Sequence, residues 1–178
     1  MSAAFSAADQ ANRLNNAVRF GTIAAVRVEG QQTFVSVELE DDLVTDFLPV
    51  FQAGAGRVRA HAAPVIDEQV AVLSPSGELT AGAVLRGLNC DAFAQPSTEE
   101  DLIVLAETDD GFSDTYDEAT HARVIAVPAG GRLALSVGAL TIRIEGGGIT
   151  LDAGGSPVTV AASTITLDGP VNLGGSGG

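Results

Sequence analysis

The sequence predicts an all-β chain in which a short N-terminal helix and a small barrel precede a needle shared by several copies of the chain. Two observations lead to this prediction. Between residues 21 and 88 apolar residues recur at every second position in five closely spaced runs, and shorter runs of the same kind fill residues 131–178 without helical spacing. A period of two places successive side chains on opposite faces of a strand, so each run has one aliphatic face.

Residues 1–19 are predicted to form an N-terminal segment with one short helix. Between Ala8 and Val18 the apolar residues have helical spacing, the composition favours helix, and Asp9 stands near the start. The period then changes to two, so we expect this helix to lead directly into a strand.

Residues 20–95 are predicted to form the barrel. The turn formers Glu29-Gly30 and Ser74-Pro-Ser-Gly77 separate runs that alternate with a period of two. Five strands in so short a segment favour a small barrel of the oligonucleotide/oligosaccharide-binding (OB) type. The expected strands cover residues 23–28, 33–39, 43–50, 69–73 and 79–88.

Residues 96–130 are predicted to be an acidic neck, entered through a linker at residues 91–98. Residues 99–118 contain nine acidic side chains and no basic one, around candidate strands at 102–105 and 111–116, and a further strand is expected at 122–127. Carboxylate oxygens suit Ca²⁺, but the spacing does not match the twelve-residue calcium loop. A solvated acidic face is the preferred interpretation, with a bound cation left open.

Residues 131–178 are predicted to form the needle. Nothing else in this stretch could cover its aliphatic face, and a single-chain β-helix would need more coils than these residues supply. We therefore expect other copies of the chain to provide the cover, with the aliphatic side chains inward. The predicted needle core consists of Leu133, Leu135, Val137, Leu140, Ile142, Ile144, Ile149, Leu151, Val158, Val160, Ile165, Leu167, Val171 and Leu173.

The composition excludes several classes of function. The chain of 178 residues has nine arginines, no lysine and 23 acidic residues, for a formal charge of −14. Such a charge disfavours binding to nucleic acid, because that affinity comes largely from cations that displace counterions. A single cysteine offers neither a disulfide framework nor a thiolate cluster. Neither a membrane helix nor a secretory signal is evident, so we expect a soluble protein made in the cytoplasm.

Few side chains are candidates for chemistry. His61 is expected to be a solvated loop residue, His121 has an equally weak case as a metal ligand, and Cys90 is expected to be a small buried residue. Arg57 and Arg59 lie in the loop between the third and fourth predicted strands, where they could contact a neighbouring copy or another protein. A plain surface role for the two arginines stays open.

The order of several short motifs resembles the baseplate assembly protein V, or central spike, of contractile-tailed bacteriophages. The matching stretch begins at Arg19-Phe-Gly-Thr-Ile-Ala-Ala-Val26 and continues through Asp46-Phe-Leu-Pro49 and Asp67-Glu-Gln-Val-Ala-Val-Leu-Ser-Pro-Ser-Gly-Glu-Leu79. Ala53-Gly54, Arg57, Pro64 and Gly82-Ala-Val-Leu85 fit the same pattern, and the later layout agrees from Gly111 onward. The resemblance covers nearly the whole chain.

This resemblance implies a homotrimer with an OB barrel docked on the tail hub and an intertwined triple-stranded β-helix pointing at the host. Sheath contraction would drive the needle through the outer membrane, which the protein contacts transiently. The implied location is the virion, in the tail baseplate, after synthesis in the host cytoplasm. The implied role is structural, with no enzymatic activity and no nucleic-acid partner, and Arg57 and Arg59 become candidate contacts with the hub.

The C-terminus departs from the family pattern. Many members end in a His-x-His pair that holds an iron ion at the apex, whereas this chain ends in Asn172-Leu-Gly-Gly-Ser-Gly-Gly178. Without imidazoles or thiolates the apex lacks suitable ligands, so we expect no iron and no other cofactor. A small tip protein that contacts Leu173 is expected instead.

The sequence leaves three alternatives to a phage tail spike. A spike from a related contractile injection system would share the mechanism. A trimeric β-helical enzyme would need a catalytic histidine or paired carboxylates, and the needle has no histidine. A glycan-binding fibre tip would need exposed aromatic residues, and the sequence from Gly131 has none.

Overall fold

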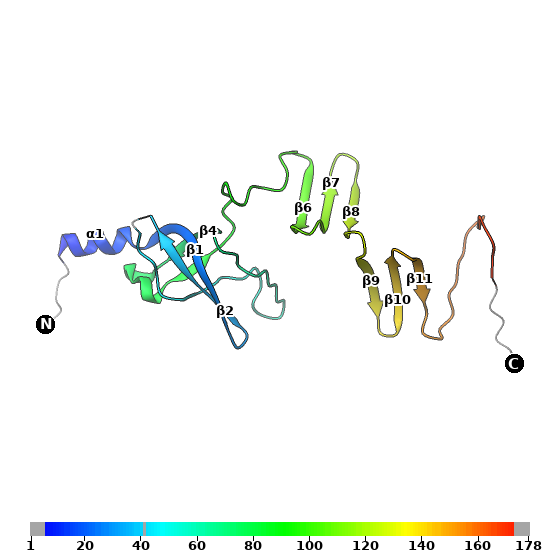
Figure 1. The fold of residues 1–178 in the computed structure, drawn as a ribbon, viewed down its shortest axis with the longest axis horizontal. Helices are drawn as coiled ribbons and strands as arrows, with labels where there is room; N and C mark the ends of the chain where they lie inside the picture. Colours follow the sequence, from blue (N-terminus) through cyan, green and yellow to red (C-terminus); the bar gives the residue numbers. More distant parts are fainter. Residues whose placement is uncertain (1–5, 41, 173–178) are drawn as a thin grey trace. The chain divides into compact units, whose positions relative to one another are not determined.

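The computed structural model describes residues 6–40 and 42–172 and divides the chain into two units, 1–98 and 99–178 (Figure 1). The secondary structure is almost entirely β, with one α-helix, as the sequence predicts. The first unit contains the helix and a five-stranded sheet, and the second contains two three-stranded sheets. Each unit is described separately below.

Helix α1 (Ala7–Asn15) begins where the Oγ atom of Ser6 accepts a hydrogen bond from the backbone N–H of Asp9, at 3.2 Å. Ser6 is therefore an N-cap: its hydroxyl accepts a hydrogen bond from a first-turn N–H group that has no acceptor within the helix. The helix ends at Asn15 with Asn16 as its C-cap, and β1 begins at Val18. The predicted helix-to-strand transition is therefore confirmed, with the helix ending three residues before the predicted Val18.

The first unit forms the predicted barrel from strands β1 (Val18–Glu29), β2 (Gln32–Leu39), β3 (Leu48–Pro49), β4 (Gln69–Leu73) and β5 (Ala83–Leu85). Their order is β3-β2-β1-β4-β5, and every neighbouring pair is antiparallel. A parallel bridge between Val50 and Val84, with a 2.9 Å bond from Phe51 N–H to Val84 O, brings the two edge strands together. This contact closes the sheet into a small barrel.

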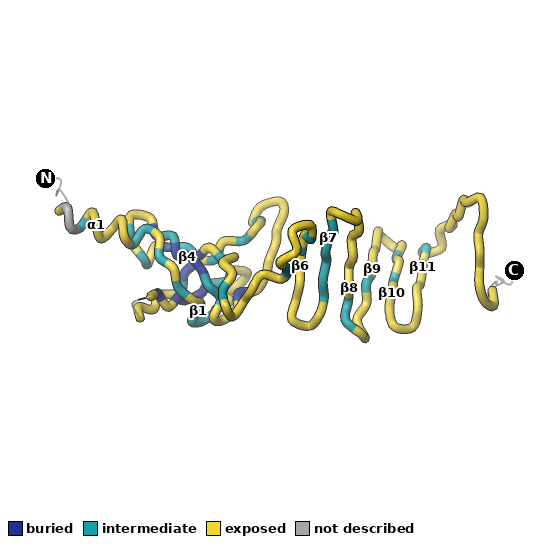
Figure 2. The backbone as a smooth tube through the Cα atoms, turned by 90° about the horizontal axis from the view of Figure 1, so that it is seen from above, coloured by how far each residue is buried: buried dark blue, intermediate teal, exposed yellow. Residues whose placement is uncertain are grey.

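The barrel interior is aliphatic. Its most deeply buried side chains stand at every second position of β2 and β4, as expected of strands whose one face covers a core, and Ser36 and Ala71 between them are also buried. The core consists of Ile23, Val35, Val37, Leu39, Leu48, Val70, Val72 and Val84. Figure 2 shows that the buried residues of the described chain all lie in this first unit.

Two predicted barrel strands were too long. The strand expected at 43–50 is only β3, because Thr45 turns back onto β2: its Oγ1 accepts from Val37 N–H at 3.0 Å and its own N–H donates to Val37 O. The strand expected at 79–88 is only β5, because the 3₁₀ turn η2 (Leu79–Ala81) occupies its start, just after a first 3₁₀ turn η1 (Pro75–Gly77).

The second unit consists of two antiparallel meanders. The first joins β6 (Leu102–Glu107), β7 (Ser113–Asp117) and β8 (Ala122–Ala126), and the second joins β9 (Arg132–Val137), β10 (Leu140–Glu145) and β11 (Gly148–Asp152). No residue between 99 and 172 is buried (Figure 2). One copy of the chain therefore gives this unit no hydrophobic core.

Candidate docking and assembly surfaces

The aliphatic side chains of β9, β10 and β11 share one face. Ile142 lies directly opposite Leu135 on β9 and Leu151 on β11, and Ile144 lies opposite Leu133 and Ile149. Leu140 and Val137 form a third pair on this face. Residues that are directly opposite in a ladder project to the same side, so this face of the meander is continuously aliphatic.

The other face of this meander is polar. Arg143 lies opposite Ala134 and Thr150, and Thr141 lies opposite Ser136 and Asp152. The Ser136 and Thr141 hydroxyl oxygens are 3.2 Å apart. The predicted division of β9–β11 into an aliphatic and a polar face is therefore the one that the register produces.

The aliphatic face has no cover within the described chain. Ile142 and Ile144 are 43% and 46% exposed, although they lie on the central strand of the meander. We define the aliphatic face as Leu133, Leu135, Val137, Leu140, Ile142, Ile144, Ile149 and Leu151. Burying this surface would be favourable by about 25 cal/mol for each Å² of apolar area removed from water, so its exposure in one chain is costly.

The remaining residues of the predicted needle core lie beyond β11. The structure assigns no strand to residues 153–172, although the alternating runs of this stretch predict strands there. An isolated run cannot form a ladder without a partner strand. Its exposed aliphatic residues are Val158, Val160, Ile165, Leu167 and Val171, and Leu173 lies outside the described residues.

The acidic residues of the first meander do not converge on one point. Asp110 accepts hydrogen bonds from the Thr108 hydroxyl and from Phe112 N–H in the β6–β7 turn, and Asp117 accepts from Thr120 N–H in the β7–β8 turn. Each of these carboxylates therefore stabilises its own turn. Within residues 6–40 and 42–172, no three metal-ligating side chains gather into a possible cation site.

Asp114 has a different partner. Both of its oxygens accept hydrogen bonds from Arg123 on β8, at 2.7 and 3.0 Å. Hydrogen bonding to Arg123 lowers the pKa of Asp114 below its ordinary value of 3.8 and raises that of Arg123. The pKa values of Asp110 and Asp117 are lowered in the same way by the Thr108 hydroxyl and the Thr120 backbone N–H.

In the first unit, the segment between β3 and β4 folds into a small closed loop. Ala60 N–H donates to Gly54 O at 2.9 Å, and Ala55 and Arg59 form an isolated bridge. A β-carbon on Gly54 would lie 2.8 Å from the Val58 carbonyl oxygen, so the turn is tight at this point. The loop tip presents Arg57, with Val58 77% exposed.

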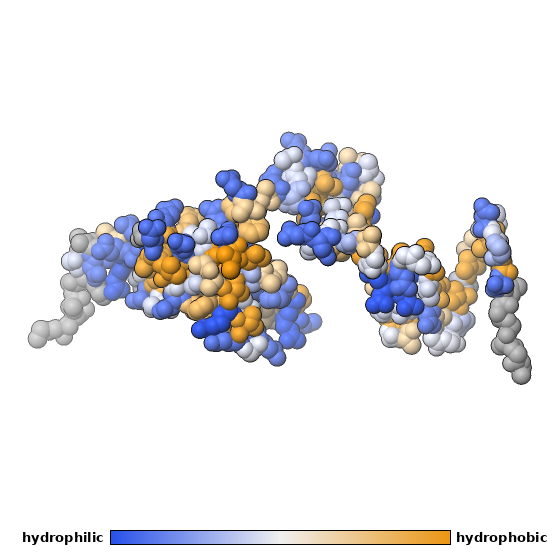
Figure 3. All heavy atoms as spheres, viewed as in Figure 1, coloured by the Kyte–Doolittle hydropathy of each residue, from blue (hydrophilic) through white to orange (hydrophobic). Residues whose placement is uncertain are grey.

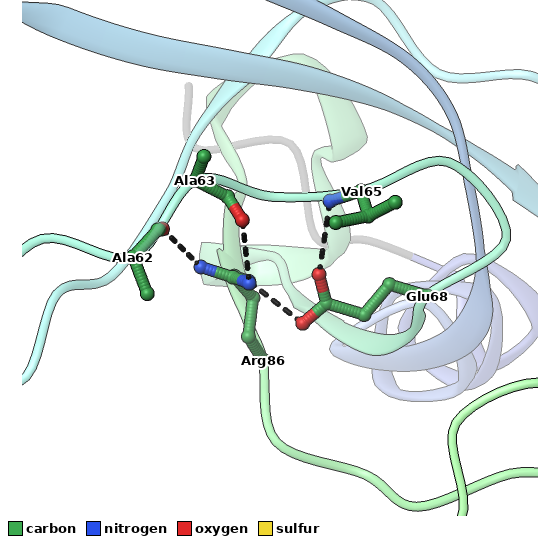
Figure 4. Close-up of polar contacts among 5 residues, drawn as sticks. All are labelled: Ala62, Ala63, Val65, Glu68 and Arg86. Carbon is green, nitrogen blue, oxygen red and sulfur yellow. Dashed lines mark hydrogen bonds and ion pairs between the residues drawn. The ribbon is translucent and has the colours of Figure 1, made fainter. Parts of the chain in front are cut away.

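The return of this loop to the barrel is fixed by Arg86 (Figure 4). Its Nε donates to Glu68 Oε1 at 2.7 Å, and its two terminal nitrogens donate to the carbonyls of Ala62 and Ala63 at 2.6 and 3.2 Å. The second oxygen of Glu68 accepts from Val65 N–H at 3.2 Å. A guanidinium is suited to such a site because its donors form a rigid planar fork.

A groove runs between this loop and the turn that joins β1 to β2. Arg59 and His61 line it from the loop, Gln31 and Gln32 from the turn, and Gln52 from the segment after β3. None of its lining residues is acidic. Neither Arg57 nor Arg59 makes a side-chain hydrogen bond or ion pair with the described residues.

The outer wall of the barrel carries exposed apolar residues, which Figure 3 shows as hydrophobic patches on this unit. Phe20 lies opposite Ala71, which lies opposite Leu85, so the three form one row across β1, β4 and β5. Phe20 and Leu85 are about half exposed, as is Phe51 beside β5. The alternation along the sequence predicts neither this surface nor the Arg86–Glu68 pair.

The other predicted site residues lie apart. Cys90 is half-buried, rather than buried as expected. His121 is exposed in the β7–β8 turn, where its Nδ1 is 3.4 Å from the Tyr116 hydroxyl. In the part of the chain that the structure describes, no helix is long and apolar enough to cross a membrane.

Comparison with known proteins identifies the barrel. Residues 19–88 match the family model described as the type VI secretion system/phage-baseplate injector OB domain. The match spans β1 to β5 and includes the Arg57–Arg59 loop and the Arg86–Glu68 pair. The chain matches no curated protein.

Proposed function

The barrel of this chain belongs to the type VI secretion system/phage-baseplate injector OB-domain family, and from this membership we propose that the chain is the central spike of a contractile injection apparatus. The match confirms the family resemblance over residues 19–88, and it implies a component of a baseplate. It also favours a location in the virion tail. The spike itself, its trimeric state and its action on a membrane are the parts that we propose.

The observation that supports a spike most directly is the uncovered aliphatic face of β9–β11. A unit in which no residue between 99 and 172 is buried cannot be stabilised by its own packing. Three copies around one axis would bury the aliphatic face of each against the other two. The exposed run at residues 153–172 would then gain partner strands from neighbouring chains.

A shared core also suits a mechanical role. Chains that bury one core together unfold only when they separate, and this raises the barrier to unfolding that sets kinetic stability. We propose that sheath contraction drives the trimeric end through the host outer membrane while the barrels hold the other end on the hub. A small tip protein would cover the C-terminal end of the trimer.

The family description spans phage baseplates and type VI secretion systems, so the injector of a related contractile system is the second candidate. The two share one mechanism and differ in the apparatus that carries the spike. A structural family of this kind gives no support to the enzyme alternative or to a glycan-binding tip.

The proposal is tested by native mass spectrometry of the full chain and two variants. Ile142→Asp places a carboxylate at the centre of the aliphatic face, so a trimer would have to bury three like charges, each costing several kcal/mol. Thr150→Asp is the matched control, because Thr150 lies on the polar face opposite Arg143.

We expect a trimer for the wild type and for Thr150→Asp, and smaller species for Ile142→Asp. A wild-type monomer, or equal assembly of the two variants, would contradict the shared needle.

A further inference from the structure

The groove beside the Arg57–Arg59 loop differs from the rest of this acidic chain. The chain carries 23 acidic residues, yet none lines the groove, where three glutamines, an arginine and a histidine are found instead. The lining is therefore rich in hydrogen-bond donors and free of negative charge. A surface with these properties is suited to groups that carry acceptor oxygens.

The arginines of the first unit differ in their partners. Arg86 is held by Glu68, Arg27 pairs with Glu29 at 3.3 Å, and Arg13 pairs with Asp9 at 3.7 Å. Arg57 and Arg59 have no such contact among the described residues. Their donors are available to a group outside the chain.

The loop that carries these two arginines is held in place. The turn is closed at its base by the Gly54–Ala60 hydrogen bond, and its return is fixed by Arg86 and Glu68 (Figure 4). A binding loop with a fixed backbone loses less conformational entropy when it binds. The loop therefore presents the two arginines from a fixed backbone next to the groove.

We propose that this groove binds a carboxylate-rich polypeptide segment of the protein on which the barrel is seated, an inference that rests on the proposed spike function. Guanidinium groups pair with carboxylates in a bidentate geometry, and the glutamine amides donate to carboxylate or backbone oxygens. The negative charge elsewhere on the chain repels an acidic partner, so this acid-free groove is the favoured point of approach. Such repulsion gives orientation and specificity more than affinity.

Nucleic acid is a weaker match for this groove. A backbone phosphate would also pair with arginine, but a nucleic acid extends over many charges, whereas Arg59 is the one arginine that lines the groove and Arg57 lies beside it on the same loop. The formal charge of −14 opposes such a polyanion. An oligonucleotide is therefore a competitor in the test and not the expected ligand.

The test uses the full chain at low ionic strength and a fluorescein-labelled synthetic peptide that alternates glutamate with alanine. Binding is measured by fluorescence anisotropy, with the same peptide in glutamine form and an oligothymidylate as comparison ligands. We expect the glutamate peptide to bind in preference to both. The double variant Arg57→Gln/Arg59→Gln should bind it roughly tenfold more weakly, as the loss of two exposed ion pairs implies.

Two further variants separate the groove from general charge. Arg13→Gln/Arg132→Gln removes two arginines elsewhere, so its net charge equals that of the groove variant, and we expect it to bind within about twofold of wild type. Gly54→Ala keeps every charge but disturbs the turn, because its β-carbon would crowd the Val58 carbonyl at 2.8 Å. We expect Gly54→Ala to weaken binding.

Three results would overturn the proposal: no binding of the glutamate peptide, equal binding by the groove variant and wild type, or binding of the oligothymidylate as tight as that of the glutamate peptide. Native mass measurement on the same samples keeps the two proposals apart. A trimer that does not bind the peptide rejects the groove alone, and a monomer that binds it rejects the shared needle alone.

Discussion

Arg86 and Glu68 form an ion pair of 2.7 Å that links the end of β5 to the segment just before β4. Both side chains are mostly buried, at 19% and 15% exposure. The same guanidinium also holds two carbonyls of the preceding loop, so one side chain ties together three parts of the barrel rim (Figure 4). The pair therefore holds the segment that follows the Arg57–Arg59 loop.

Arg86→Met should loosen the loop return without unfolding the barrel. A hydrogen bond to a charged group contributes about 2 kcal/mol to stability. A local loss of that size corresponds to roughly thirtyfold faster amide exchange. Hydrogen–deuterium exchange of the peptides that cover residues 60–68 measures this effect. Arg13→Met, on helix α1, is the matched control and should leave those peptides unchanged.

Gly21→Ala should destabilise the barrel. Gly21 lies on β1 opposite Leu39 and Val70, and a β-carbon there would collide with the Glu38 carbonyl and the Val37 side chain. Overpacking of this kind costs about 1–3 kcal/mol, so calorimetry should give a lower melting temperature for the first unit. Gly56→Ala is the control, since nothing lies within 4 Å of its added β-carbon. Equal melting of the two variants would show that β1 can move away from β2.

The sequence predicts the alternation well and the long-range contacts poorly. The faces of β9, β10 and β11 follow from a period of two, because the aliphatic residues of each strand alternate with other residues, and the register joins Leu135, Ile142 and Leu151 on one side. The five barrel strands are identifiable for the same reason. The Arg86–Glu68 pair is not, because the two residues are 18 positions apart and two of the acceptors are backbone carbonyls, which leave no signal in the sequence.

The sequence also predicts the ends of strands poorly. Thr45 could have continued a strand by its own propensity, but its hydroxyl bonds the backbone of Val37 and ends the regular pairing. In β1, a register shift between Ile23 and Ala25 gives the strand an irregularity that the alternation does not reveal. Of the groove beside the Arg57–Arg59 loop, the sequence predicts only the two arginines. Its glutamines come from separate segments, so their spacing along the chain gives no signal.

Acid should weaken the β6–β8 meander. The pKa values of Asp110, Asp114 and Asp117 are lowered in the folded chain, so their carboxylates stabilise the fold at a pH above the unfolded value of about 3.8. This contribution is lost as the pH falls below 3.8 and through the lowered values. Measured against the intrinsic exchange rate, which itself changes with pH, the protection of the amides of residues 102–126 should fall over that range, and Asp114→Asn should remove part of the dependence. Protection that stays constant between pH 5 and pH 2 would contradict this assignment.

High salt should reduce the stabilisation that Asp114 gains from Arg123. Arg123 is 57% exposed, so its attraction to Asp114 is open to screening by dissolved ions. At neutral pH, we expect the difference in hydrogen-exchange protection of residues 102–126 between wild type and Asp114→Asn to shrink in 1 M sodium chloride, where the Debye length is about 3 Å. A difference that does not respond to salt would indicate that Asp114 acts through packing.

Purified protein should contain no stoichiometric iron. Its two histidines lie upstream of residues 131–178, His61 in the barrel loop and His121 in the β7–β8 turn, and the segment from Leu173 to Gly178 offers no imidazole, thiolate or carboxylate side chain. Backbone carbonyls and a single serine hydroxyl bind iron weakly compared with imidazole. Elemental analysis by mass spectrometry measures the metal content directly, and His121→Ala is expected to leave it unchanged. About one iron per three chains would contradict the prediction, and a loss of that iron after removal of residues 173–178 would place it at the apex and argue against a separate tip protein there.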